Sequence, residues 1–205
     1  IMTATQHPDD ADYTHEDWTK KLLAELPPSS LQSSLHIRPP ASIIERIVEI
    51  IRQRLLHPDT ASPLRIAVVG GAITEGAGCE EASVAIPDGS IMANPTYCAW
   101  PYRLEAFLNN LLGPNVVQVV NMAEEGTDTG FMTPLVKNWI YPASVLPDGP
   151  DIIVNAYGRF DYATYQEGDP SASLEETIKS ELTSFRRAVE TSHPCGHAPL
   201  VVHLD

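Results

Sequence analysis

The stretch RIAVVGGAITEGAGC, residues 65–79, constrains the fold more than any other part of the chain. Its four consecutive apolar residues, 66–69, are typical of a strand buried on both faces of a parallel sheet. The strand breaks at once into Gly70 and Gly71. Such a break usually brings a reactive side chain or a ligand close to backbone N–H groups. We therefore predict an active-site type of loop here, although its central residue, Ala72, carries no reactive group.

From residue 64 onward, apolar runs of strand length alternate with segments of helical periodicity. We predict strands at residues 65–70, 115–123, 151–158 and 199–205, and helices at residues 100–113 and 173–192. This alternation implies right-handed crossovers and a parallel α/β sheet. Ligands of such sheets bind at the carboxyl ends of the strands. The loops at residues 70–78, 123–130 and 158–162 leave strands at that edge, so they form the candidate site.

Residues 1–63 do not show this alternation of strands and helices. Residues 14–26 predict a short helix with Thr14 as its N-cap, and a Pro/Ser-rich linker follows at residues 27–40. Residues 42–56 predict an amphipathic helix, in which Ser42 and Glu45 have capping-box spacing. Its apolar stripe comprises Ile44, Ile47, Val48, Ile51 and Leu55. We therefore divide the chain into an N-terminal helical arm with its linker, residues 1–63, and an α/β domain, residues 64–205.

The composition excludes several classes of function. The net charge is −14, and the 13 Lys and Arg residues are scattered, which argues against a surface for nucleic acid or anionic lipid. No apolar run reaches the length of a membrane span, and the N-terminus does not resemble a signal peptide. Because the chain opens on Ile1, a removed targeting segment keeps a secreted or organellar location open. We expect a soluble chain of unknown localisation.

The three cysteines do not decide the compartment. Cys79, Cys98 and Cys195 fit no zinc motif, and an odd number leaves at least one thiol outside any internal disulfide. In an oxidising compartment we expect Cys79 to pair with Cys98, because both flank the same loop. Three reduced thiols are the alternative.

Three ordered blocks of residues 64–205 resemble the SGNH (GDSL-type) hydrolase family. "GGAITEG" stands where such proteins read "GGSITEG" or "GDS", which puts Ala72 at the position of the nucleophilic serine. "NMAEEGT" aligns Asn121, and it aligns Gly126 with the family's backbone oxyanion donor. "YGRFD" stands where the family reads "GxND", which puts Phe160 at the oxyanion asparagine, followed by Asp161. The resemblance implies a flavodoxin-like three-layer α/β/α fold.

This sequence departs from the family pattern at positions that ester hydrolysis requires. Acyl transfer needs a hydroxyl nucleophile, a His base, an acid that holds the His, and oxyanion donors. Ala72 has no hydroxyl, Phe160 offers no donor, and no D-x-x-H sequence follows Phe160. Negative charge at Glu124 and Glu125 would also disfavour an oxyanion at Gly126. The resemblance therefore implies a degenerate site whose remaining binding positions are Gly71, Thr74, Asn121 and Asp161.

Other polar residues invite different interpretations. His193, His197 and His203 share no face of one element, so we expect no metal site there. Thr74, Ser83 and Ser90 are hydroxyls near the first loop, but none has the turn geometry of the missing serine. Five acids could bind a hard cation such as Ca²⁺, although a solvated acidic rim is the simpler interpretation. These are Glu75, Glu80, Glu81, Glu124 and Glu125.

The sequence thus predicts a pseudo-hydrolase with a binding or structural role and no cofactor. We expect it to dock on a larger protein assembly through the arm of residues 1–63 or through an open sheet edge. That edge is expected because the sequence stops on its fourth strand. The alternative is an active esterase of carbohydrate or lipid esters, seen as a serine-to-alanine variant and an incomplete chain. A lectin-like site for a carbohydrate or ester ligand is a third interpretation.

Overall fold

The computed structural model describes Lys20, Ala24 and residues 39–77, 83–85, 91–93, 98–141, 146, 148–158, 174–192 and 198–204. The chain forms two compact units. One comprises Ile1–Pro63 and Leu104–Val117, and the other comprises Leu64–Arg103 and Gln118–Asp205.

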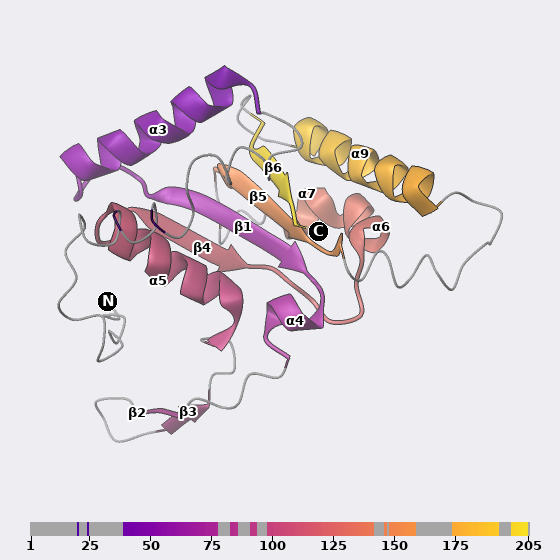
Figure 1. Ribbon diagram of the computed structural model, residues 1–205, viewed down its shortest axis with the longest axis horizontal. Helices are drawn as coiled ribbons and strands as arrows, with labels where there is room; N and C mark the ends of the chain where they lie inside the picture. Colours follow the sequence, from indigo (N-terminus) through magenta and orange to yellow (C-terminus); the bar gives the residue numbers. More distant parts are fainter. Residues whose placement is uncertain are drawn as a thin grey trace. The chain divides into compact units, whose positions relative to one another are not determined.

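The second unit is built on a parallel sheet of four strands (Figure 1). The strands are β1 (Leu64–Gly70), β4 (Val117–Asn121), β5 (Ile152–Ala156) and β6 (Leu200–His203), in the order β4-β1-β5-β6. In register, Val69 lies opposite Asn155 of β5, and Asn155 lies opposite His203 of β6. This strand order is that of a flavodoxin-type doubly wound sheet. The predicted α/β class and all four predicted strands are therefore confirmed, with boundaries that differ by a few residues.

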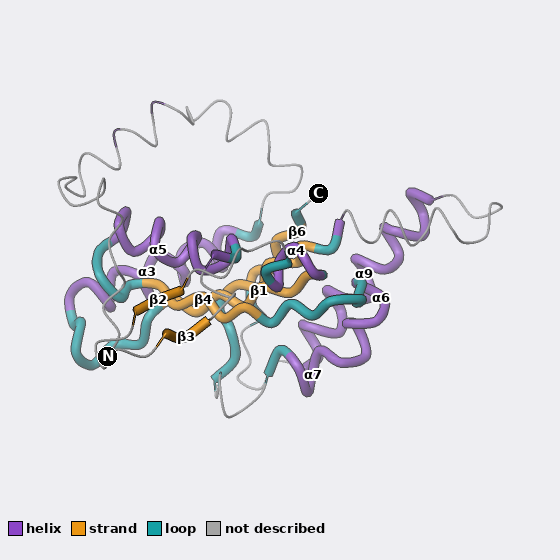
Figure 2. Tube along the Cα trace, turned by 90° about the horizontal axis from the view of Figure 1, so that it is seen from below, coloured by secondary structure: helices purple, strands orange, loops and turns teal. Residues whose placement is uncertain are grey.

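One face of this sheet is packed against helices of the same unit. These are α6 (Thr129–Met132), the 3-10 turn η2 (Thr133–Leu135), α7 (Val136–Trp139) and α9 (Leu174–Ser192), which lie together in both Figure 1 and Figure 2. Sheet residues Ala67, Val69 and Ile153 share a buried cluster with Phe185 and Val189 of α9. This cluster holds the helical layer on the sheet through apolar burial.

The central strand β1 is buried on both faces. Ile66 and Val68 point to the face opposite Ala67 and Val69, and all four are buried. This burial explains why residues 66–69 are all apolar, because a polar side chain on either face of the strand would lose its hydration.

Several short elements of the second unit were not predicted. They are α4 (Ala72–Glu75), α6, η2, α7 and an antiparallel pair of strands, β2 (Ser83–Ala85) and β3 (Ile91–Ala93). Elements of three or four residues are too short to produce a clear hydrophobic period. These short elements form because of the turns and contacts around them.

The first unit contains the long helix α3 (Ala41–Leu56) and most of α5 (Trp100–Leu112). Both helices were predicted. The predicted capping box of α3 is wrong: the N-cap is Pro40, whose carbonyl accepts from the amides of Ile43 and Ile44, and no side chain caps the helix. Ser42 therefore lies inside the first turn. Asn109 of α5 bridges the next strand, since its side chain accepts from Val117 N at 2.8 Å and donates to Val117 O at 2.9 Å.

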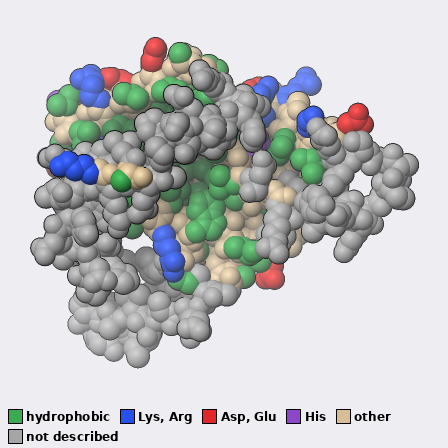
Figure 3. All heavy atoms as spheres, in the orientation of Figure 1, with side chains coloured by type: hydrophobic (Ala, Val, Ile, Leu, Met, Phe, Trp, Pro, Cys, Tyr) green, Lys and Arg blue, Asp and Glu red, His purple; other side chains and the backbone are tan. Residues whose placement is uncertain are grey.

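Some sequence predictions concern residues outside the described part of the chain. Of the predicted helix 14–26 only Lys20 and Ala24 are described, and both are helical and exposed. Cys98 is disulfide-bonded, but Cys79 and Cys195 lie outside the described residues, so the pairing of Cys98 with Cys79 stays a prediction. None of the described helices is long and apolar enough to cross a membrane. On the described surface shown in Figure 3, Lys and Arg side chains are interspersed with hydrophobic and other side chains.

Candidate functional site

The candidate site begins where β1 turns into α4. The carbonyl of Gly71 accepts from the amides of Thr74 and Glu75 at 2.9 and 3.0 Å, which starts a helix directly after the strand. Ala72 is the first residue of that helix. The turn lies at the carboxyl end of β1, beside β5, which is the switch point where ligands bind in sheets of this order.

Thr74 fixes the shape of this turn. A Cβ atom on Gly70 would lie 2.5 Å from the Oγ1 atom of Thr74, so only glycine fits at that position. Thr74 is buried, and its hydroxyl accepts a hydrogen bond from Trp100 Nε1 at 3.3 Å. Thr74 is thus a structural residue of the turn, and its hydroxyl is engaged rather than presented to a ligand.

Asn121 joins the first loop to the second. Its Nδ2 donates to the carbonyl of Thr74 at 2.8 Å, and its Oδ1 accepts from the amide of Ala123 at 3.2 Å. The amide of Glu124 donates in turn to the carbonyl of Gly70 at 2.9 Å. The structure therefore brings together two of the predicted binding residues, Thr74 and Asn121, and Figure 1 shows the segment after β4 passing beside α4.

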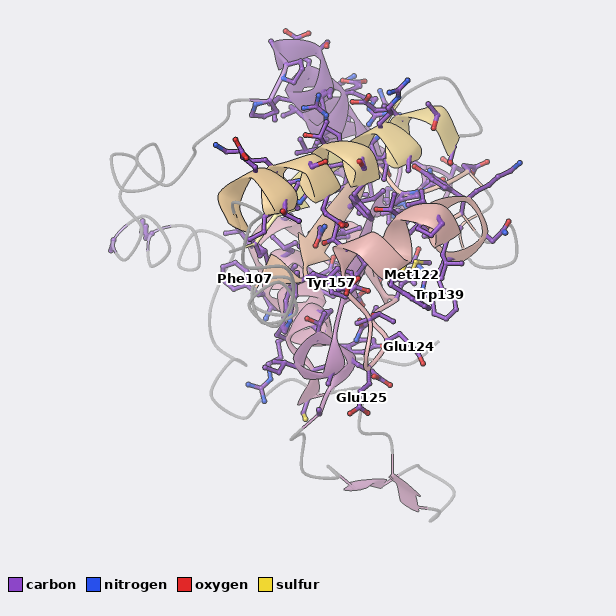
Figure 4. The ribbon with its side chains drawn as sticks, turned by 90° about the vertical axis from the view of Figure 1, so that its right-hand side faces the viewer. Phe107, Met122, Glu124, Glu125, Trp139 and Tyr157 are labelled. Atoms are coloured by element: carbon purple, nitrogen blue, oxygen red, sulfur yellow. The ribbon has the colours of Figure 1, made fainter. Side chains whose placement is uncertain are left out.

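One backbone amide of the second loop donates a hydrogen bond to a carboxylate. Oε2 of Glu75 accepts from the backbone N–H of Glu125 at 2.8 Å. Gly126, the predicted oxyanion donor, is the next residue; it is exposed, and its φ of 74° lies in the left-handed region that favours glycine. Glu124 and Glu125 are also exposed, and Figure 4 shows their side chains pointing outward. The loop therefore presents negative charge around Gly126.

A pair of buried hydroxyls holds the same loop to the end of β5. The hydroxyls of Thr127 and Tyr157 are 2.8 Å apart. Thr127 uses its one hydroxyl hydrogen on the carbonyl of Glu124, at 2.6 Å, so the hydroxyl of Tyr157 is the donor between them. Tyr157 is fully buried and points into the interior in Figure 4.

Further polar side chains of the second unit serve its packing. Nδ2 of Asn155 donates to the buried hydroxyl of Thr129 at 3.1 Å. The ring of His203, a candidate in the sequence, packs edge-to-face on Phe185 with centroids 6.4 Å apart. Burial raises the pKa of the Tyr141 hydroxyl, which donates to the carbonyl of Val189 at 3.4 Å.

Several predicted residues lie outside the described part of the chain. Among them are Phe160 and Asp161 of the third block, and also Glu80, Glu81, Ser90, His193 and His197. Within the described ranges, no three His, Cys, Asp or Glu side chains gather so that they could hold a metal ion.

The sequence did not reveal the roles of Glu75, Thr127 and Tyr157. Glu75 was a candidate only as part of an acidic rim, whereas it binds a backbone amide 50 positions away. Thr127 and Tyr157 are 30 positions apart and carry no motif. The one available signal was their position, since Thr127 lies in the predicted loop 123–130 and Tyr157 lies next to the carboxyl end of the predicted strand 151–158.

Comparison with known proteins gives only distant similarities, and these are to solved structures. No protein-family profile matches the chain, and no curated protein matches it in sequence. Among solved structures, the tail fiber protein gp63.1 from an E. coli phage is similar with a TM-score of 0.48 and 17% identity, over 78% of this chain and 19% of that chain. The chain thus spans about a fifth of that protein. LAE5, an alpha/beta hydrolase enzyme from the metagenome of Lake Arreo, Spain, is similar with a TM-score of 0.38 and 13% identity, over 66% of this chain and 76% of that chain.

Proposed function

We propose that this chain is a catalytically degenerate protein of the SGNH-hydrolase type, which keeps the α/β scaffold for a binding role. The observation that carries the proposal is the position of Ala72. It is the first residue of α4, directly after β1, where an SGNH hydrolase would hold its nucleophilic serine. A methyl group cannot attack an ester, and loss of one triad member typically lowers the rate by several orders of magnitude.

The second loop supports the same proposal. An oxyanion hole must offer free N–H donors to developing negative charge. Here the amide of Glu125 already donates to the carboxylate of Glu75, one residue before Gly126. The exposed acids Glu124 and Glu125 add charge of the wrong sign. The assignments of Gly126, Phe160 and Asp161 to family positions belong to this proposal.

An assay with an ester and a serine-directed probe tests the proposal. The purified chain is incubated with p-nitrophenyl acetate and with a fluorophosphonate probe, and Ala72→Ser is measured beside it. We expect no turnover above buffer and no labelling of the native chain. The Ser variant should gain little, since no D-x-x-H sequence, which would carry the base of the family, follows Phe160. Turnover by the native chain that the probe abolishes would contradict the proposal.

An active esterase is the second candidate. The support for it is that β1 ends at Gly70 and α4 begins at position 72, so a serine there would stand at the start of a helix after the strand. Peptide mass spectrometry of the protein from its natural source, over residues 65–79, separates the two candidates. Alanine at position 72 supports the degenerate protein, and serine supports the enzyme.

The binding role is proposed to reside in residues 1–63, with residues 64–205 as the scaffold domain, or at an open edge of the sheet. The support for the arm is that α3 exposes large apolar side chains, among them Val48 and Leu55. Exposed apolar surface of this kind commonly marks contact with another protein.

A further inference from the structure

Helix α3 carries two apolar lines, of which one is exposed. Ile47 is buried, with 9% of its surface exposed. Ile44, Val48 and Leu55 lie on another line of the same helix and are 41%, 57% and 52% exposed. A surface helix normally needs one apolar stripe toward its own core. The second line of α3 therefore offers a surface for another helix.

The three exposed residues and the half-buried Ile51 together have the spacing of a coiled-coil seam. Ile44, Val48, Ile51 and Leu55 follow one another at intervals of four, three and four residues, as d, a, d and a positions of a heptad do. We name these four residues the α3 seam. A seam of β-branched and Leu side chains packs against the same kind of seam on a second helix.

The charges beside the α3 seam are arranged for an antiparallel pair. Glu45 and Arg52 both occupy e positions, and both are exposed. The guanidinium of Arg52 donates two hydrogen bonds of 2.7 Å to the carboxylate of Glu49, and this exposed pair orients the cation beside the seam. In an antiparallel helix pair, Glu45 of each copy faces Arg52 of the other copy. In that orientation the two helix dipoles are also antiparallel, which is favourable.

We propose that the α3 seam binds a second copy of this chain as an antiparallel, two-fold symmetric helix pair. The charge pattern selects this occupant, because a self-complementary surface is what a two-fold interface requires. The inference deepens the docking part of the proposed function, and it holds whether or not position 72 supports catalysis. A helix of 16 residues is about 24 Å long, so the contact is small and association is expected at roughly micromolar concentration.

The first test compares two matched variants of the full chain by sedimentation velocity between about 1 and 200 µM. Val48 and Ile73 are similarly exposed, at 57% and 54%, but only Val48 belongs to the α3 seam. We expect the native chain and Ile73→Glu to dimerise, and Val48→Glu to stay monomeric, with circular dichroism confirming that each is folded. A native chain that stays monomeric throughout would overturn the proposal, and so would a dimer that Val48→Glu leaves unchanged.

The second test uses charge reversal and keeps the apolar seam intact. Glu45→Arg places like charges against Arg52 of the other copy, and Arg52→Glu places like charges against Glu45. Each single variant should therefore dimerise about tenfold more weakly than the native chain. A mixture of the two should dimerise again, because both facing pairs are then opposite in charge. Failure of the mixture to recover would exclude the antiparallel pair and favour a foreign partner or residues 14–26 of the same chain on the seam. Neither test involves ester hydrolysis, so its failure is distinct from failure of the proposed degeneracy.

Discussion

The side chain of Asn121 is hydrogen-bonded to the backbone of Thr74. Nδ2 of Asn121, at the end of β4, donates to the Thr74 carbonyl in α4 at 2.8 Å. This bond joins the two loops that contain the predicted nucleophile and oxyanion positions. Asn121 is thus a positioning residue for the edge of the sheet, whatever that edge binds.

We predict that Asn121→Ala destabilises the fold by about 1 kcal/mol, because the Thr74 carbonyl loses its donor. Amide exchange in α4 should also become faster. Urea unfolding and hydrogen exchange measure these effects. Asn138→Ala, on the exposed surface of α7, is the matched control and should change the free energy of unfolding by less than about 0.5 kcal/mol. Equal effects of both variants would show that the Asn121 bond has no special role.

The hydroxyl pair of Thr127 and Tyr157 should be energetically coupled. Tyr157→Phe removes the buried donor and should cost about 1 kcal/mol, and Thr127→Val removes both bonds of Thr127 and should cost more. A double-mutant cycle on unfolding free energies measures the coupling, which we expect to be about 1 kcal/mol. Additive losses would mean that the two hydroxyls stabilise the loop independently.

Two glycines of the candidate site should differ in their tolerance of alanine. Gly70→Ala forces a Cβ against the buried side chain of Thr74, so we expect a loss of about 2–4 kcal/mol in unfolding free energy. Gly126→Ala meets no atom within 4 Å and pays only for its φ of 74°, about 1–2 kcal/mol. Thermal and urea unfolding of the two variants measure the order. The reverse order would contradict the packing of Thr74 on Gly70.

Glu49 provides a prediction on pH. Its hydrogen bonds to Arg52, and then to Gln53, lower the pKa of its carboxyl from 4.5 to about 2. A carboxyl with a lower pKa in the folded state stabilises the fold above pH 4.5 and loses that contribution as the pH falls toward 2. Carbon NMR of the Glu49 carboxyl should therefore show a midpoint near 2. Arg52→Ala should raise the midpoint more than Gln53→Ala, and an unchanged midpoint in Arg52→Ala would refute the assigned cause.

Much of the fold was readable from the sequence because its signals are local. The run at residues 66–69 predicts β1, since a strand buried on both faces has no polar position. The periodicity of residues 42–56 predicts α3, because a helix keeps a fixed turn angle. The capping box failed for a local reason as well. Helix α3 begins one residue earlier, after Pro40, which places Ser42 where its hydroxyl cannot cap the helix.

The sequence by itself determined the class of the fold and the lack of a reactive group at Ala72, and it predicts the place of the candidate site, because each depends on residue type and order. Only the tertiary structure decided which distant groups meet. The carboxylate of Glu75 reaches the amide of Glu125, and Tyr157 donates to Thr127, because the parallel order of the strands brings their carboxyl ends to one edge. The tertiary structure also decided that Ile47 is buried and Val48 is exposed, since both residues are equally apolar and only packing distinguishes them.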